Sequence, residues 1–326
     1  MKINRKKNLV CFGVILILLN FTARYSIAKC PTRMGSVFPQ ESFLVIAHRG
    51  STIKFPENTI PAFKEALNTD GANSLEVDLS LTKDRKVVLW HDWDPNNPIA
   101  MVRQEKGEEG RKFKPYVFSL VKPRLQKKVS ELDFSEFVDK HGYKDKITNV
   151  KTNLKIPTLQ DLIEWAAKQD KLKFLMLKLR VPVDEKYLIP VMVDEIRKAI
   201  DHAHPSPRFQ FVILVPHKES LKLVSNQLNN SLFSFDHELP PSGITNYHRF
   251  TTVPVAMNFK NIFSSIGFHK YASTSESNLD PWTVYKFILT LDLRLRDNYK
   301  KSTSKYIKII TWTFNDEKKI KCLINL

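Results

Sequence analysis

The chain has 326 residues, of which 42% are hydrophobic and 26% are charged, and its formal net charge is +17. This length suits one large core, and the composition is that of a globular protein, which argues against a disordered or fibrous chain. The positive charge favours anionic partners. Because no basic patch with interleaved aromatic residues stands out, we expect phosphate-bearing small molecules or an anionic membrane surface rather than nucleic acid.

Residues 1–28 combine a basic start with a short apolar run from Leu9 to Phe21 and a small-residue cleavage site. This pattern is typical of a secretory signal peptide and predicts a secreted or periplasmic protein, with an N-terminal membrane anchor as the alternative. The remaining chain keeps Cys30 and Cys322 near its two ends. An oxidising compartment would allow a disulfide between them, and two free thiols are the other possibility.

Residues 29–326 are predicted to form one domain, because no repeat, low-complexity segment or flexible linker divides them. In chain order, strands are expected at 44–49, 74–81, 87–90, 173–180, 209–215, 232–235, 253–259 and 306–313, and helices at 60–67, 158–167, 184–202, 219–228 and 278–298. Residues 93–155 are polar, basic and irregular, and they form the longest insertion between strand candidates. Strands that alternate with helices imply a mainly parallel sheet, and right-handed crossovers over this length favour a barrel.

Two carboxylates lie on the strand at 74–81, in the sequence Ser-Leu-Glu-Val-Asp-Leu-Ser-Leu. Glu76 and Asp78 are two residues apart, so both point to the same face of a strand. The flanking Leu75, Val77 and Leu79 occupy the other face and would pack outward against helices. Paired carboxylates at a strand end can hold a hard divalent cation, although an isolated pair of this kind can also be a solvated strand face.

Two histidines, His48 and His91, each follow an apolar strand directly. In a barrel this places them at the carboxyl-end rim, where they could act as general acid and general base. Arg49 offers a planar fork for phosphate oxygens, and Lys178 offers a point charge for the same group. Each of these residues alone is also compatible with a structural role, so the prediction depends on their joint placement.

These motifs together resemble the glycerophosphodiester phosphodiesterase family. The resemblance is carried by His48-Arg49-Gly50, Pro56-Glu57-Asn58-Thr59, Glu76-Val77-Asp78, Thr82-Lys83-Asp84 and His91-Asp92, with weaker similarity at Ile156-Pro157-Thr158-Leu159, Lys178 and Thr311-Trp312-Thr313-Phe314-Asn315. It implies a TIM (β/α)8-type barrel that hydrolyses glycerophosphodiesters to an alcohol and glycerol phosphate with one divalent cation, Mg²⁺ or Ca²⁺.

The resemblance also implies a role for each matching residue. His48 and His91 would be the acid/base pair, Arg49 and Lys178 would hold the phosphoryl oxygens, and Glu76 and Asp78 would be metal ligands. Glu57 would support the metal or Arg49, and Trp312 would be a further supporting residue.

The sequence departs from the family pattern at two places. The family usually has a third metal-binding carboxylate two residues before the lysine, and here that position is Met176. A thioether is a poor ligand for magnesium or calcium, so weakened metal binding is expected. The chain also ends at Leu326, inside what is expected to be the helix before the last strand, so the barrel is predicted to lack or replace that strand.

Two alternatives to this function remain open. The run Gly71-Ala72-Asn73-Ser74-Leu75-Glu76 is similar to the corresponding stretch of spider-venom phospholipase D, and the basic charge suits a lipid surface, so the substrate could be a phospholipid or lysophospholipid. The second alternative is a non-catalytic relative that binds a phosphodiester or a membrane, which Met176 and the C-terminal departure suggest.

Overall fold

A computed structural model of the protein describes residues 45–118, 126–203 and 209–216, residues Ser220 and Leu223, and the backbones of three further strands at 233–237, 262–267 and 307–312. All of these lie in one of two compact units of the chain, the unit formed by residues 43–275 and 291–313. The predicted signal peptide, both cysteines of the proposed disulfide, the predicted helices at 219–228 and 278–298 and the predicted strand at 253–259 lie outside the described residues, apart from Ser220 and Leu223.

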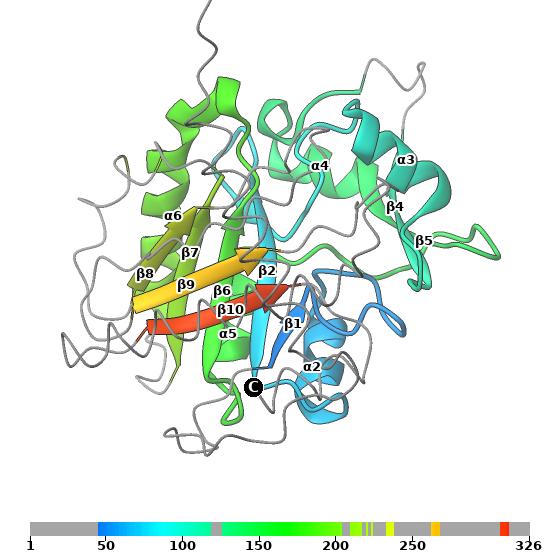
Figure 1. Cartoon of the computed structure of the whole chain (residues 1–326). Helices are drawn as coiled ribbons and strands as arrows, with labels where there is room; N and C mark the ends of the chain where they lie inside the picture. Colours follow the sequence, from blue (N-terminus) through cyan, green and yellow to red (C-terminus); the bar gives the residue numbers. More distant parts are fainter. Residues whose placement is uncertain are drawn as a thin grey trace, which may run out of the picture. The chain divides into compact units, whose positions relative to one another are not determined.

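Five parallel strands form the main sheet in the order β1-β2-β6-β7-β8 (Figure 1). They are β1 (Ile46–His48), β2 (Ser74–Leu81), β6 (Phe174–Leu179), β7 (Gln210–Val215) and β8 (Phe233–His237). A second parallel pair joins β9 (Ile262–Gly267) to β10 (Ile307–Trp312). The prediction of a mainly parallel sheet is confirmed, and the parallel strands with their connecting helices form an α/β barrel-type fold.

Helices follow the strands at the predicted places. They are α2 (Ile60–Asn68), α5 (Leu159–Ala166) and α6 (Ile189–Ala203), the last preceded by the short helix η4 (Val183–Leu188). The side chain of Thr59 accepts a hydrogen bond from the backbone N–H of Ala62, and that of Thr158 accepts one from Asp161. These caps satisfy backbone donors that the first helical turn leaves free, and they set where α2 and α5 begin.

The two faces of the strands have different surroundings, as the alternating pattern predicts. Leu75, Val77 and Leu79 of β2 are fully buried in one large hydrophobic cluster that also contains the buried faces of α2, α5 and α6. The opposite face of β2 carries Glu76 and Asp78, both buried. The sheet therefore holds its carboxylates on the face turned away from the helices.

The expectation that residues 87–90 form a strand of the parallel sheet is wrong. Strand β3 contains only Val87 and Val88, and it pairs antiparallel with the last residues of β2. The turn between them closes with a hydrogen bond from the backbone N–H of Thr82 to the carbonyl of Lys86. Arg85 adopts a positive φ of 64° there, so the chain doubles back at once instead of crossing over through a helix.

The insertion at 93–155 is not irregular where the structure describes it, contrary to expectation. It contains the helices α3 (Pro98–Lys106), η3 (Val129–Glu131) and α4 (Phe134–Lys140) and the antiparallel strands β4 (Phe113–Val117) and β5 (His141–Asp145) (Figure 1). Trp90, Phe137 and Tyr143 belong to a separate buried cluster beneath these elements. The insertion thus has a core of its own, which its short-range sequence pattern did not indicate.

The region between β7 and β10 contains two described strands. The expected strand at 232–235 is β8, and β9 begins at Ile262, after the expected strand at 253–259. The expected strand at 306–313 is confirmed as β10.

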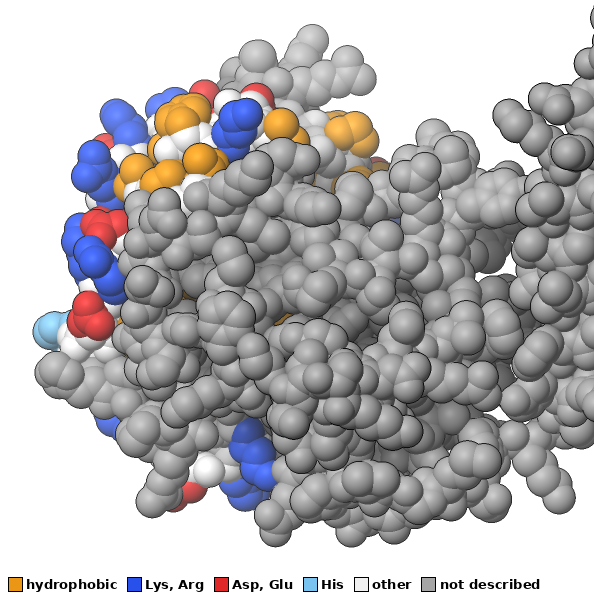
Figure 2. Space-filling view, turned by 60° about the vertical axis from the view of Figure 1, so that its left-hand side comes forward, with side chains coloured by type: hydrophobic (Ala, Val, Ile, Leu, Met, Phe, Trp, Pro, Cys, Tyr) orange, Lys and Arg blue, Asp and Glu red, His pale blue; other side chains and the backbone are white. Residues whose placement is uncertain are grey.

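The outer surface of α6 carries charges of both signs. Asp194 pairs with Arg197 and Lys198, and blue and red side chains lie next to each other on the face shown in Figure 2. In the described part of the chain, we find no helix whose length and apolar character would let it cross a bilayer.

Candidate active site

Strand register places the predicted site residues side by side. His48 on β1 is the neighbour of Glu76 on β2, and Glu76 is the neighbour of Met176 on β6. Two residues further along, Asp78 is the neighbour of Lys178. Because parallel strands keep the same direction, all five residues lie near the carboxyl-end edge of the sheet, where α/β barrels build their active sites.

A sharp turn follows β1 and presents Arg49 to this edge. Arg49 and Gly50 both have positive φ, 62° and 83°, and such a value is unusual for a residue with a side chain. A Cβ atom on Gly50 would lie 2.8 Å from the Cβ of Ala62 in α2. Glycine is therefore required here both by the turn and by the close approach of α2.

Arg49 is buried among carboxylates. Its Nε lies 2.7 Å from Oδ2 of Asp78, and its Nη1 donates to Oε2 of Glu57 at 2.9 Å. Asn58 fixes the same carboxylate, because its side-chain nitrogen donates to Oδ2 of Asp78 and its side-chain oxygen accepts from the Asp78 backbone N–H, each at 3.1 Å. Asn58 also adopts a positive φ, 55°. Glu57 was expected to support either the metal or Arg49, and in the structure it contacts Arg49.

Glu76 and Asp78 are electrostatically different although they are two residues apart. Burial and the charge of Asp78 raise the pKa of Glu76 to about 8. Burial alone would raise the pKa of Asp78 too, but Arg49, Arg180 and Lys178 outweigh it and lower that pKa to about 2. Asp78 is thus the stable anion of the pair, and Glu76 resists ionisation.

The carboxylate of Glu76 is also poor in partners. Among the described residues, none hydrogen-bonds to either of its buried oxygens, and Nε2 of His48 lies 3.7 Å from Oε2. Oδ1 of Asp78 likewise has no hydrogen bond there, with Nε of Arg180 at 3.9 Å. Buried polar atoms normally have partners, so these oxygens are candidates for cation ligands.

His91 lies at the site although the strand before it, β3, is not part of the parallel sheet. The segment that carries it is fixed by three hydrogen bonds: Ser80 Oγ donates to the carbonyl of Trp90, Trp90 Nε1 donates to the carbonyl of Asp92, and Arg180 Nε donates to the carbonyl of His91. The predicted rim position of His91 therefore comes from β3 and these side-chain contacts.

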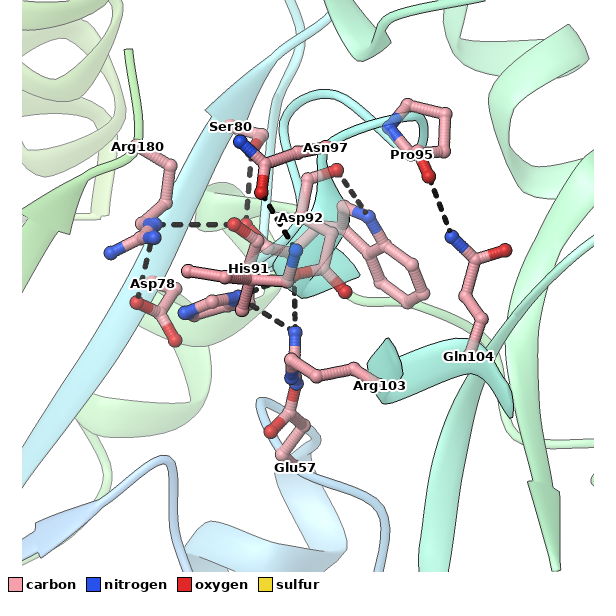
Figure 3. A network of polar contacts seen from close by, with 12 residues as sticks. Glu57, Asp78, Ser80, His91, Asp92, Pro95, Asn97, Arg103, Gln104 and Arg180 are labelled. Atoms are coloured by element: carbon pink, nitrogen blue, oxygen red, sulfur yellow. Dashed lines mark hydrogen bonds and ion pairs between the residues drawn. The ribbon is translucent and has the colours of Figure 1, made fainter. Parts of the chain in front are cut away.

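Nδ1 of His91 lies between two groups of opposite charge (Figure 3). It is 2.6 Å from Oδ1 of Asp92 and 2.7 Å from Nη1 of Arg103. It can donate to the carboxylate or accept from the guanidinium, and either bond leaves Nε2 as the nitrogen for the site. Burial and the charge of Arg180 lower the pKa of His91 well below its usual value, and burial and Arg49 do the same for His48. Both imidazoles are therefore neutral at pH 7.

Arg103, in the last turn of α3, links the insertion to this edge of the sheet. Its guanidinium donates to Glu57 and to Asp92 (Figure 3). It also donates to Oε1 of Glu108 at 2.6 Å. Arg111 pairs with the same two glutamates, Glu57 and Glu108. The insertion thus contributes the buried Arg103, the partly buried Arg111 and one carboxylate to the site.

Sequence reasoning missed Arg103, Glu108, Arg111 and Arg180. The first three lie in a segment without strand periodicity, so no pattern indicated which of its many charged residues face inward. Arg180 comes directly after β6, and that position at a strand end was the available signal.

The third metal-binding carboxylate of the family pattern is missing, and one expected supporting residue lies outside the described side chains. Met176 is buried next to Phe174 and Val212, so an apolar contact occupies the expected place of a third carboxylate. Within the described residues there is no group of three His, Cys, Asp or Glu side chains that could hold a metal ion. Trp312 is the last residue of β10, and its side chain is not among those described.

The sequence of residues 48–326 matches the model of the glycerophosphoryl diester phosphodiesterase family. The chain belongs to this family. An uncharacterized protein of Bacillus subtilis (strain 168) is 31% identical over 134 residues, which are 41% of this chain and 44% of that protein. A glycerophosphodiester phosphodiesterase of Caldanaerobacter subterraneus is 55% identical over 49 residues, 15% of this chain and 20% of that protein. The chain thus matches less than half the length of these curated relatives.

The fold is similar to that of a solved structure from Silicibacter pomeroyi DSS-3 that carries the same family name. The TM-score is 0.53 at 16% sequence identity, and the similarity covers 85% of each chain. At this identity the likeness supports the barrel-type fold alone.

Proposed function

We propose that this member of the glycerophosphodiester phosphodiesterase family hydrolyses glycerophosphodiesters to an alcohol and glycerol phosphate. One observation carries the proposal: Arg49, Glu76, Asp78, His48 and His91 come from three separate segments and meet at one edge of the sheet. Each has the chemistry that the cleavage of a phosphodiester requires, which is an anion clamp, cation ligands and proton carriers.

The family is generally dependent on a divalent metal ion, and the residues of this site fit one. Glu76 and Asp78 would hold Mg²⁺ or Ca²⁺, because their unpartnered buried oxygens are hard, anionic ligands that a cation would satisfy. Met176 removes one anionic ligand, and water would complete the shell. The bound ion would supply positive charge to the non-bridging oxygens of the phosphodiester.

His48 and His91 are the proposed proton carriers. When Nδ1 of His91 donates to Asp92, Nε2 is unprotonated and can accept a proton; when Nδ1 accepts from Arg103, Nε2 carries the proton and can donate it. A neutral imidazole held between these two partners can therefore serve either step. His48, one strand away and partly exposed, would perform the complementary transfer.

Arg49 and Lys178 are the proposed clamps for the phosphoryl oxygens. Arg49 is fixed by Asp78 and Glu57, and Lys178 lies in register with Asp78 on the neighbouring strand. A planar guanidinium that is already oriented loses little entropy when it binds phosphate.

Hydrolysis of glycerophosphocholine in the presence of Mg²⁺ or Ca²⁺ tests this proposal. The wild-type protein should release choline and glycerol phosphate, and His48→Ala and His91→Ala should each lower the rate by about 10² or more. His202→Ala, in the last turn of α6, is the matched control and should leave the rate unchanged. Equal activity in all four proteins would contradict the mechanism, and phosphodiester binding without turnover would point to a non-catalytic relative.

A phospholipase D-like action on phospholipids or lysophospholipids is the alternative substrate class, and the similar run at 71–76 suggested it. In the structure, Asn73 lies at the amino end of β2, where its side chain accepts from the backbone N–H of Val45 and its carbonyl accepts from Lys173. These contacts connect the first residues of neighbouring strands, at the end of the sheet opposite to the site. Residues 71–75 therefore do not distinguish a phospholipid substrate from a glycerophosphodiester. Choline release from lysophosphatidylcholine vesicles would separate the two classes.

We further propose that the chain is exported, on the basis of the signal-peptide pattern at 1–28. Mass spectrometry of the natural protein should find its N-terminus close to residue 29. A retained N-terminal segment would favour the anchor instead.

A further inference from the structure

Glu108 occupies a place where three guanidinium groups converge. Its Oε1 accepts from Nη1 of Arg49 at 3.1 Å and from Nε of Arg103 at 2.6 Å, and its Oε2 lies 2.8 Å from Nη2 of Arg111. Three donors around one carboxylate form an anion-binding arrangement, and guanidinium groups bind the oxygens of phosphate in the same way.

The three arginines do not depend on Glu108 for their positions. Arg49 is also paired with Asp78 and Glu57, and Arg103 and Arg111 are also paired with Glu57. Their side chains are only 6 to 12% exposed. If the carboxylate of Glu108 left, each arginine would keep a buried partner, and the donors directed at Glu108 would stay in place.

Glu108 is more exposed than the three arginines. Its side chain is 32% exposed, and it lies between Gly107 and Gly110, whose φ angles of 68° and 74° make a tight turn after α3. The turn itself is held independently of the carboxylate, because Lys146 Nζ donates to the backbone carbonyl of Glu108 at 2.8 Å. Rotation of the side chain alone would therefore release the carboxylate to solvent.

We propose that Arg49, Arg103 and Arg111 form one anion subsite for a phosphate group, and that Glu108 fills it as an internal substitute for that group. An incoming phosphate displaces Glu108 and takes its three donors. The insertion thereby adds Arg103 and Arg111 to the phosphate-binding residues and makes Glu108 a competitor that weakens binding. The identity of the phosphate as that of a glycerophosphodiester depends on the function proposed above, whereas the subsite itself does not.

Calorimetric titration with inorganic phosphate tests the subsite without any turnover. At one fixed divalent-cation concentration, Glu108→Gln should bind phosphate at least about tenfold more tightly than the wild type, equivalent to about 1.4 kcal/mol. Glu105→Gln removes the same charge from the exposed surface of α3 and should bind like the wild type. The double variant Glu108→Gln with Arg111→Met should lose the gain.

Two results would overturn the proposal: a Glu108→Gln protein that binds phosphate no better than the wild type, or a gain that survives Arg111→Met. Thermal unfolding of each variant identifies any that fail to fold, and Arg111→Lys, which keeps the charge but loses the fork, then takes the place of Arg111→Met. Because the readout is binding, a failure of this proposal is distinguishable from an absence of phosphodiesterase activity.

Discussion

Ionisation of Glu76 is unfavourable in the folded protein. This residue is buried, it stands two residues from the anionic Asp78, and in the described part of the chain no hydrogen-bond donor reaches its carboxylate. A buried charge of this kind costs free energy unless it is compensated. We therefore expect Glu76 to connect stability, pH and cation binding.

Glu76→Gln should change stability in a pH-dependent way. The pKa of Glu76 is raised from 4.5 to about 8 in the folded state, so between these values the folded protein holds a proton that the unfolded chain has released. This contribution makes the wild type less stable as the pH rises from 4.5 to 8. The variant should therefore have a higher Tm than the wild type at pH 8.5 and a similar Tm at pH 4.5.

Thermal unfolding with and without Mg²⁺ extends this measurement. A cation at 100 times its dissociation constant stabilises the folded state by about 2.7 kcal/mol, so Mg²⁺ at that excess should raise the Tm of the wild type at pH 8.5 and leave that of Glu76→Gln nearly unchanged. Glu164→Gln, an exposed acid on α5, should behave like the wild type. A lower Tm of Glu76→Gln at both pH values would show that the carboxylate of Glu76 does not destabilise the folded protein.

Arg103→Lys should affect catalysis more than folding. The lysine keeps the charge, but its single nitrogen cannot take the two positions from which Nη1 of Arg103 reaches Asp92 and His91 and Nη2 reaches Glu57. We expect kcat to fall by about 10², together with a change in the tautomer of His91 that ¹⁵N NMR detects. Arg197→Lys, at an exposed pair on α6, is the control. An unchanged tautomer and pH profile would mean that Arg103 only supports the insertion.

Site residues could be predicted where their position follows from neighbouring residues in the sequence. Glu76 and Asp78 could be placed on one face because two-residue spacing on a strand determines direction, and His48 and Arg49 followed from the end of β1. Glu108 could not, because it lies in a turn with no periodic pattern and its contact with Arg49 joins residues 59 positions apart in the chain.

At the scale of elements, the turn between β1 and α2 determines where Arg49 points. It combines two positive φ angles with a close approach of α2, and the backbone N–H of Ser51 donates to the carbonyl of Ala62 at 2.9 Å. The helix therefore packs directly on the turn. A side chain at Gly50 would disturb both the helix and the arginine.

Gly50→Ala and Gly71→Ala form a matched pair for this element. Both glycines have positive φ, 83° and 77°, but a Cβ at residue 50 would meet Ala62 at 2.8 Å, whereas a Cβ at residue 71 would meet nothing within 4 Å. Gly71→Ala should cost about 1 kcal/mol of unfolding free energy from backbone strain alone, and Gly50→Ala should cost clearly more. Urea unfolding measures both, and equal losses would contradict the close approach.

The elements themselves were predictable to different degrees. The helices α2 and α5 were predictable because threonine caps and apolar periodicity coincide there, β2 because its carboxylates alternate with apolar residues, and β6 because it is a short apolar run. The sequence Val-Val-Leu-Trp at 87–90 was misleading, since a buried apolar run does not tell whether its partner is parallel or antiparallel. The fold of the insertion depends on a small core in which Trp90 packs with Phe137 and Tyr143, both of which lie far from it in the chain.

At the largest scale, the residues that pack the core and the residues of the site lie on different faces of the sheet. Among the described residues, one face of the sheet packs its leucines and valines against helices, while the other face and the insertion together contain the charged groups of the site. The site therefore lies where the barrel-type sheet meets the insertion. The alternation of strands and helices was enough to predict the parallel sheet; where β9 begins was not, because the region before it contains few strong strand or helix signals.

The measurement that tests this account most directly is the initial rate of glycerophosphocholine hydrolysis as a function of Mg²⁺ concentration, for the wild type and Glu76→Gln. We predict that Mg²⁺ activates the wild type with saturation, that a chelator abolishes the rate, and that the variant is slower by about 10² or more at any Mg²⁺ concentration, as expected when charge stabilisation at the reacting group is lost. A wild-type rate that is unaffected by the chelator, or a variant as active as the wild type, would contradict the assignment of this edge of the sheet as a metal-dependent phosphodiesterase site.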